Sequence, residues 1–134
     1  MNALFVLLCT LISVSHQVNF LQMIKDLEDA VDNDAKECYN TLHINREKFD
    51  RWLKMDILPE DRQLKCFLNC IFTSLRTIDD SGTSLTRNMT KYLEVDEEKQ
   101  NYIMNLCEKL KGDDRCDKVF DMVNCLRSVL KLEV

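Results

Sequence analysis

Hydrophobic residues recur at spacings of three and four along most of the chain, which is the period of one face of an α-helix. The first such segment runs from Leu21 to Leu42, and acidic and basic residues fill its other side. This pattern predicts an amphipathic helix that bends near Asn33. Its apolar positions are Leu21, Ile24, Leu27, Val31, Ala35, Cys38 and Leu42.

Two more helices are predicted in the middle of the chain. Asn45 is one of the residue types that cap helix N-termini, so a second helix begins there. Its apolar side consists of Phe49, Trp52, Leu53 and Ile57. A proline loses no hydrogen bond in a first helical turn, so Pro59, Glu60 and Asp61 predict the start of a third helix, which ends near Leu75.

The second half of the chain predicts a loop and three further helices. Residues 77–84 are rich in Asp, Ser, Thr and Gly, which favour turns. A short fourth helix follows, with Leu85, Met89, Tyr92 and Leu93 on its apolar side. Asp96 caps a fifth helix, which ends at Gly112 and carries Ile103, Leu106, Cys107 and Leu110. Asp113 or Asp114 caps a sixth helix that continues toward the C-terminus.

Residues 1–17 differ in composition from the rest of the chain. They contain no Asp, Glu, Lys or Arg, and an apolar run extends from Ala3 to Val14. The run is too short to span a bilayer but is typical of a secretory signal peptide, with the small residues Ser13 and Ser15 near the cleavage site. We therefore expect a signal peptide over 1–17 and one secreted domain over 18–134. A buried N-terminal helix is the alternative.

The cysteines indicate disulfides. Cleavage after residue 17 removes Cys9 and leaves Cys38, Cys66, Cys70, Cys107, Cys116 and Cys125. An even number of cysteines in a short secreted chain is typical of a disulfide framework, but six allow about 15 pairings and the sequence pattern does not choose among them. A zinc site is disfavoured, because the cysteine spacings do not fit one and His43 is the only histidine after residue 17.

The predicted third and sixth helices carry apolar residues over more of their circumference than a helix needs when only one side faces the core. Cys66 and Cys70 share a face of the third helix, and each should bond with a different element because helical neighbours rarely satisfy disulfide torsions. The opposite arc consists of Leu64, Phe67, Leu68, Ile71 and Leu75. The sixth helix carries Val119, Phe120, Met122, Val123, Leu126, Val129 and Leu130. Ordinary core packing would cover these faces, and an internal apolar cavity is the functional alternative.

Charge and motifs disfavour other classes of function. The net charge of −5 disfavours binding to nucleic acid or to an anionic membrane. No hydrophobic run after residue 17 is long enough for membrane insertion. We expect His43 to lie at the surface or to cap a helix, because no nucleophile motif accompanies it. We therefore expect no enzyme, no cofactor and no metal.

The cysteine pattern after residue 17 is C-x27-C-x3-C-x36-C-x8-C-x8-C, which closely resembles that of insect odorant-binding proteins, including pheromone-binding proteins. The resemblance covers nearly the whole chain after residue 17. It implies six helices around an apolar pocket and the disulfides Cys38–Cys70, Cys66–Cys116 and Cys107–Cys125. It also implies that the short tail, Leu126 to Val134, folds back as a wall of the pocket.

We therefore expect an all-α fold, a compact six-helix bundle that is stapled by disulfides and encloses an apolar cavity. Its expected function is to carry an odorant, a pheromone or a similar small hydrophobic ligand in extracellular fluid. The pocket-lining candidates are Phe67, Leu68, Ile71, Leu75, Met89, Leu93, Phe120, Val123 and Leu130. Thr73, Tyr92, Tyr102 or the terminal carboxylate would orient a polar group of the ligand, and Trp52 either packs in the core or lines the pocket.

The expected partners and a candidate modification follow from the same resemblance and from one sequence motif. A chemosensory receptor is a candidate partner, and we expect a monomer or a weak homodimer. The alternative function is a secreted protein-interaction factor of the same fold, such as a venom or reproductive-fluid component, with no ligand to transport. Asn88, Met89 and Thr90 form an N-glycosylation sequon, so Asn88 is a candidate glycosylation site.

Overall fold

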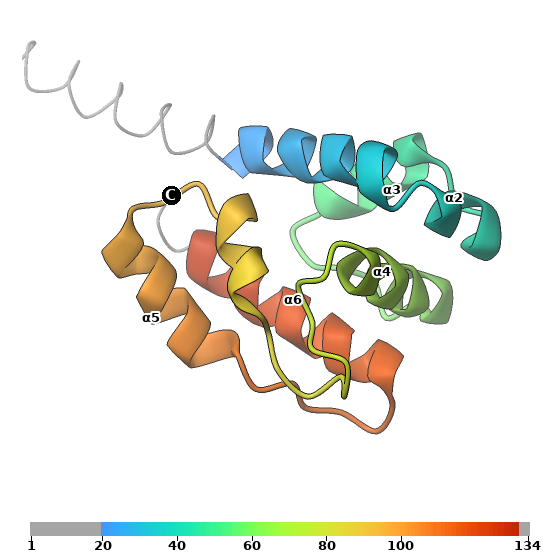
Figure 1. The fold of residues 1–134 in the computed structure, drawn as a ribbon. Helices are drawn as coiled ribbons and strands as arrows, with labels where there is room; N and C mark the ends of the chain where they lie inside the picture. The colour runs from blue at the N-terminus through green and yellow to red at the C-terminus, as the bar shows by residue number, and fades with distance from the viewer. Residues whose placement is uncertain (1–19, 132–134) are drawn as a thin grey trace, which may run out of the picture.

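The computed structural model describes residues 20–131 (Figure 1). The expected signal peptide, the end of the tail and the terminal carboxylate lie outside the described residues. Residues 20–34 form the N-terminal helix. The further elements are α2 (Glu37–Leu42), α3 (Arg46–Leu53), α4 (Arg62–Ser74), the 3₁₀-helix η1 (Arg87–Tyr92), α5 (Glu97–Cys107) and α6 (Arg115–Lys131). The all-α fold is thereby confirmed, and the two β-bridges within this range, Ile78 with Leu85 and Ser84 with Lys109, are isolated.

The first predicted helix consists of two helices, which makes seven rather than six within residues 20–131. The break falls just after the predicted bend. The Ala35 N–H still bonds with Val31 O over 2.9 Å, but the Cys38 N–H bonds with Ala35 O, three residues back, over 3.0 Å. This shorter step marks a turn between the helices, and Val31, Ala35 and Cys38 remain buried on both sides of it.

Three predicted N-caps are confirmed. Asn45 Oδ1 accepts a hydrogen bond from Lys48 N over 2.8 Å, and Asp96 Oδ1 accepts one from Lys99 N over 2.8 Å. Asp114 Oδ1 accepts one from Asp117 N over 2.9 Å, which selects Asp114 over its neighbour as the cap of α6. Each carboxylate or amide oxygen satisfies a backbone N–H that has no partner inside its helix.

The predicted start of the third helix is wrong by three residues. Asp61 is extended and caps α4, accepting from Leu64 N over 3.0 Å. The Asp61 N–H bonds with Pro59 O over 2.9 Å instead of entering a helix. Pro59 therefore lies in the connection between α3 and α4. The same connection leaves Ile57 83% exposed, so the prediction that Ile57 belongs to the apolar side of α3 is also wrong.

The fourth and fifth helices are shorter than predicted. Leu85 precedes η1 and donates its N–H to Glu108 O over 2.9 Å, and Leu110 donates its N–H to Thr83 O over 3.0 Å. These two long-range bonds draw the chain out of α5 after Cys107. Leu110 is thus buried outside the helix, and Leu106, predicted on its apolar side, is 56% exposed.

The prediction that α5 ends at Gly112 is wrong. Gly112 lies instead in the connection between α5 and α6. Its φ of 151° is a backbone conformation that favours glycine, and a Cβ atom there would come within 2.8 Å of Lys118 N. Glycine is therefore required because the chain passes close to the first turn of α6.

The core lies between α4 and α6, which pack on one another more extensively than any other pair of labelled helices. Figure 1 shows the N-terminal helix and α5 on opposite sides of α6. The side chain of Phe67 is fully buried, and its ring meets that of Phe49 edge to face with centroids 4.9 Å apart. This arrangement is favourable for aromatic pairs.

Three disulfides connect the helices. Cys38–Cys70 joins α2 to α4, Cys66–Cys116 joins α4 to α6, and Cys107–Cys125 joins α5 to α6. These are the pairings that the resemblance implies, and neighbouring cysteines on α4 do bond with different elements. Each bond restricts the unfolded chain over a separation of 18 to 50 residues, which contributes about 3 to 4 kcal/mol to stability.

Candidate functional site

A cavity of about 80 Å³ lies between the N-terminal helix, η1 and α6. Its walls are almost entirely apolar, and Tyr92 and Arg127 are the two lining residues whose side chains carry a polar group. The lining residues are Phe20, Met23, Ile24, Leu27, Leu53, Phe72, Met89, Tyr92, Leu93, Val123, Leu126, Arg127 and Leu130. Such a space favours an apolar molecule over water, because water needs two to four polar partners.

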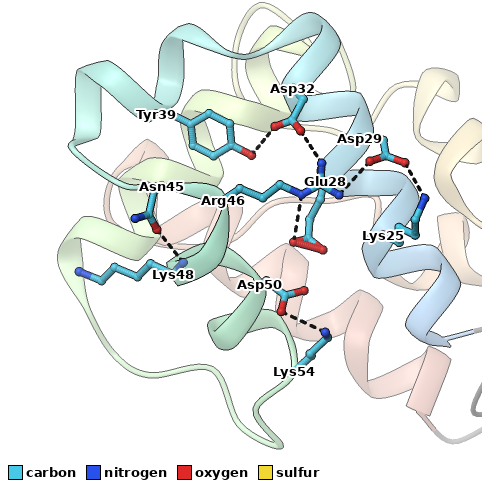
Figure 2. A network of polar contacts seen from close by, with 10 residues as sticks. All are labelled: Lys25, Glu28, Asp29, Asp32, Tyr39, Asn45, Arg46, Lys48, Asp50 and Lys54. Atoms are coloured by element: carbon cyan, nitrogen blue, oxygen red, sulfur yellow. Dashed lines mark hydrogen bonds and ion pairs between the residues drawn. The ribbon is translucent and has the colours of Figure 1, made fainter.

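The N-terminal helix forms one wall with residues at helical spacing, from Phe20 to Leu27. Figure 2 shows how α3 holds this helix: Arg46 donates from Nη2 to Asp29 Oδ1 over 2.8 Å and from Nη1 to Asp32. Arg46 also forms an ion pair with Glu28. The Tyr39 hydroxyl donates to Asp32 Oδ1 over 2.9 Å and so adds a tie from α2.

A second set of bonds positions η1 over the cavity. Thr77 is fully buried, and its hydroxyl donates to Phe72 O over 2.8 Å at the end of α4. The Thr86 N–H bonds with Thr77 O over 2.9 Å, immediately before η1 begins. Met89 of η1 is 1% exposed as a result. The segment is therefore held by backbone and hydroxyl groups, while its apolar side chains remain directed at the core.

Two carboxyl pairs lie beside the N-terminal helix. Burial and the neighbouring Asp50 raise the pKa of Glu28 to about 7. Burial alone would raise the pKa of Asp50, but hydrogen bonds with Lys54 and Glu28 lower it. The second pair consists of Asp26 and Glu94. A hydrogen bond with Asp26, together with partial burial, raises the pKa of Glu94 to about 7. Protonation of each glutamate thus lets a carboxyl pair form a hydrogen bond instead of repelling.

Arg127 and Tyr92 are the polar groups of the cavity wall. Arg127 is 7% exposed and donates from Nη1 to Leu53 O over 2.7 Å and from Nη2 to Met55 O. Burial raises the pKa of Tyr92, and Asp34 adds to this effect. The hydroxyl therefore stays protonated at neutral pH and is able to donate.

The structure brings four of the predicted lining residues to the cavity, namely Met89, Leu93, Val123 and Leu130. The other five, Phe67, Leu68, Ile71, Leu75 and Phe120, lie in the packed core outside its lining. The apolar arc of α4 meets other helices, and α4 contributes Phe72 to the cavity instead. The part that any of these residues plays in ligand binding stays a prediction.

Sequence reasoning missed the wall formed by the N-terminal helix and the lining residues Leu53, Phe72, Leu126 and Arg127. For Arg127 a signal was present, because it is a charged residue between Leu126 and Val129 on the apolar face of α6. The α6 helix is continuous to Lys131, so the tail does not fold back over residues 126–131. Residues 132–134 lie outside the described part.

The remaining candidates lie elsewhere. Tyr102 is 55% exposed, and Thr73 is an exposed residue that bonds with Asn69, so neither lines the cavity. Trp52 is buried outside the cavity lining, with the Lys48 ammonium 4.9 Å from its ring centroid. His43 ends α2 in a left-handed conformation, with φ at 56°.

Asn88 lies on η1, and its Nδ2 donates to Arg76 O over 3.1 Å. A glycan attached to this nitrogen would compete with the bond, and Met89 in the middle of the sequon is buried. Glycosylation at Asn88 stays a prediction.

Larger surface hollows have different chemistry. One of about 950 Å³ beside α2 is lined mainly by exposed or partly exposed polar residues, among them Asp32, Lys36 and Asn40. It suits an apolar ligand less well than the smaller cavity. Within residues 20–131, no helix has the length and apolar character needed to cross a bilayer, and no metal-binding group of His, Cys, Asp and Glu side chains occurs.

Residues 22–129 match the model of the PBP/GOBP family. The chain is 30% identical to general odorant-binding protein 69a of Drosophila melanogaster over 93 residues, which cover 69% of this chain and 63% of that protein. It is 23% identical to general odorant-binding protein 56a of the same species over 130 residues, 96% of this chain and 94% of the relative. Odorant-binding protein 10 of Aedes aegypti is 27% identical over 74 residues, 54% of this chain and 52% of the relative.

Proposed function

The chain belongs to the PBP/GOBP family, and on this basis we propose that it is a secreted carrier of a small hydrophobic ligand. The observation that carries the proposal is the apolar cavity beneath the N-terminal helix. The relatives named odorant-binding proteins support an odorant, a pheromone or a similar molecule as the ligand. The protein holds this ligand by burial and performs no chemistry on it.

The cavity must widen to hold such a ligand. Its volume of about 80 Å³ is smaller than the 300 to 1,000 Å³ typical of sites for drug-sized molecules. Met23 of the N-terminal helix and Met89 of η1 both line the cavity, and methionine side chains are unbranched and adapt readily to a new shape. We propose that their rotation enlarges the space, while the disulfides keep α4, α5 and α6 together.

Secretion follows from the same proposal. Disulfides form and persist in oxidising compartments, and three of them connect the described helices. Residues 1–17 would act as the signal peptide, which the mass of the secreted protein tests directly. A chemosensory receptor is a candidate partner, and the protein would act as a monomer or a weak homodimer.

Dye binding tests the carrier function. The full chain is expressed in a secreting host, and the protein recovered from the medium is titrated with N-phenyl-1-naphthylamine, a dye that fluoresces in apolar surroundings. We expect saturable binding at one site and displacement by long-chain alcohols, esters or acids. A folded protein that binds no dye saturably would contradict the carrier function and favour a solid core.

A variant that fills the cavity localises the site. Val123→Phe adds a ring to the cavity wall and should weaken dye binding about tenfold or more, because overpacking costs about 1 to 3 kcal/mol. The matched control is Leu106→Phe, since Leu106 is exposed on α5. Equal weakening by both variants, or by neither, would contradict a site in this cavity.

A further inference from the structure

Among residues 20–131, Arg127 is the one charged residue that lines the cavity. Arg127 is 7% exposed, and its neighbours along the cavity wall, Leu126 and Leu130, are apolar. A guanidinium in such surroundings has lost most of its hydration, which is costly unless another group compensates for it. The partners of Arg127 therefore decide what the cavity favours.

These partners are neutral. The guanidinium donates to the backbone carbonyls of Leu53, Met55 and Asp56, all at the end of α3 or just after it. None of the ion pairs within residues 20–131 includes Arg127. Burial lowers the pKa of Arg127, and the charge of Asp56 acts against this effect. The hydrogen-bond partners of this positive charge are thus backbone carbonyls, and no acidic side chain among residues 20–131 forms an ion pair with it.

A second cation lies one helical turn further along α6. The Lys131 ammonium donates to Asp56 O over 2.5 Å, so it binds the same connecting segment as Arg127. Burial lowers the pKa of Lys131, and the repulsion from Arg127 lowers it further. Two cations of α6 therefore bind the segment that follows α3, although the chain as a whole carries a net charge of −5.

Arg127 also has hydrogen-bonding capacity left. A guanidinium carries five N–H donors. In Arg127 one Nη1–H and both Nη2–H groups donate to the three carbonyls. The Nε–H and one Nη1–H have no acceptor among residues 20–131. A ligand oxygen in the cavity would supply one.

We propose that the ligand is an aliphatic amphiphile with a carboxylate head, and that this carboxylate binds Arg127 while the chain occupies the apolar cavity. The proposal rests on the carrier function proposed above and specifies the ligand class. A carboxylate both accepts the free N–H groups and neutralises the buried charge, and charge-assisted bonds of this kind are stronger than neutral ones. An alcohol or an ester offers only the acceptor, and an amine adds a third cation.

The test is displacement of N-phenyl-1-naphthylamine from the secreted wild-type protein near neutral pH. The competitors share one chain length: dodecanoic acid, dodecanol, methyl dodecanoate and dodecylamine. We expect the acid to displace the dye at a concentration about tenfold lower than the ester, with the amine weakest. An ester or alcohol that competes as well as the acid would overturn the proposal.

Substitution assigns the preference to Arg127. Arg127→Gln should abolish the advantage of the acid over the ester, while Arg51→Gln, which replaces an exposed arginine on α3, should leave that advantage as it is in the wild type. If Arg127→Gln does not fold, Lys131→Gln takes its place and should reduce the acid preference in the same direction. A preference that survives the substitution in folded protein would overturn the assignment.

The carrier function and the carboxylate ligand are contradicted by different results. Absence of saturable dye binding would contradict the carrier function itself. Saturable binding with no preference for the acid would leave the carrier function intact and overturn only the carboxylate ligand.

Discussion

Arg46 of α3 binds Asp29 of the N-terminal helix over 2.8 Å, and this bond anchors the helix that forms one wall of the cavity. The same guanidinium reaches Asp32 one turn further on and Glu28 on the buried side. One cation thus compensates three carboxylates of the N-terminal helix, and the stability of this wall depends on Arg46.

Removing the cation should loosen the wall. In Arg46→Met the stem of the side chain is kept and the charge is lost, which leaves neighbouring carboxylates to repel one another. Because Arg46 is 38% exposed at its side chain, solvent screens part of the interaction and we expect a loss of about 1 kcal/mol in the free energy of unfolding. Urea unfolding with intact disulfides measures this loss.

Hydrogen exchange tests the location of the effect. Amides of residues 20–34 should exchange faster in Arg46→Met, while those of α4 and α6 should change little, because local opening precedes global unfolding. The matched control is Arg51→Met, whose ion pair with Glu47 is exposed within one helix and should contribute less than about 0.5 kcal/mol. Exchange that is equally fast in both variants would contradict the anchoring role of Arg46.

Glu28 should make stability depend on pH. Its pKa is about 7 in the folded protein, because of burial and the neighbouring Asp50, against 4.5 for an ordinary glutamate. Between these values the folded state binds more protons than the unfolded state, so the free energy of unfolding falls as pH rises from 4.5 to about 7. Glu94, whose pKa is raised to about 7, acts in the same direction.

Glu28→Gln should remove the share of this slope that belongs to Glu28. The amide donates a hydrogen bond as the protonated carboxyl does, and it cannot become a buried charge. We therefore expect the variant to be more stable than wild type above neutral pH and similar to it near pH 4.5, as measured by urea midpoints across this range. Glu47→Gln, at an exposed position, should keep the wild-type slope. An unchanged slope in Glu28→Gln would show that other groups carry it.

Local signals in the sequence predicted three of the helix N-caps correctly. A cap depends on one side chain and a backbone N–H two or three residues further on, as at Asn45 and Asp96. The end of α5 depended on partners far away in the sequence. The bonds of Leu85 and Leu110 with residues 108 and 83 end the helix before Gly112, and no local pattern shows them.

The cavity was harder to predict than the fold. The apolar arcs of α4 and α6 were correctly identified, but a helical pattern does not show which element lies opposite an arc. Phe67 therefore faces Phe49 in the core, while the cavity wall includes Phe72, only five residues away on the same helix. The N-terminal helix contributes to the cavity because Arg46 holds it there, which is a tertiary contact.

Gly112 should tolerate no side chain. An alanine there would place its Cβ 2.8 Å from Lys118 N, and because this atom belongs to the backbone of α6 it cannot rotate away. The φ of 151° adds strain for any residue with a Cβ. We expect Gly112→Ala to lower the free energy of unfolding by about 1 to 3 kcal/mol, measured by urea unfolding with intact disulfides. Lys111→Ala, one position earlier at an exposed site, is the control and should be neutral. Equal stability of Gly112→Ala and the wild type would mean that the connection between α5 and α6 follows a different path from the one described.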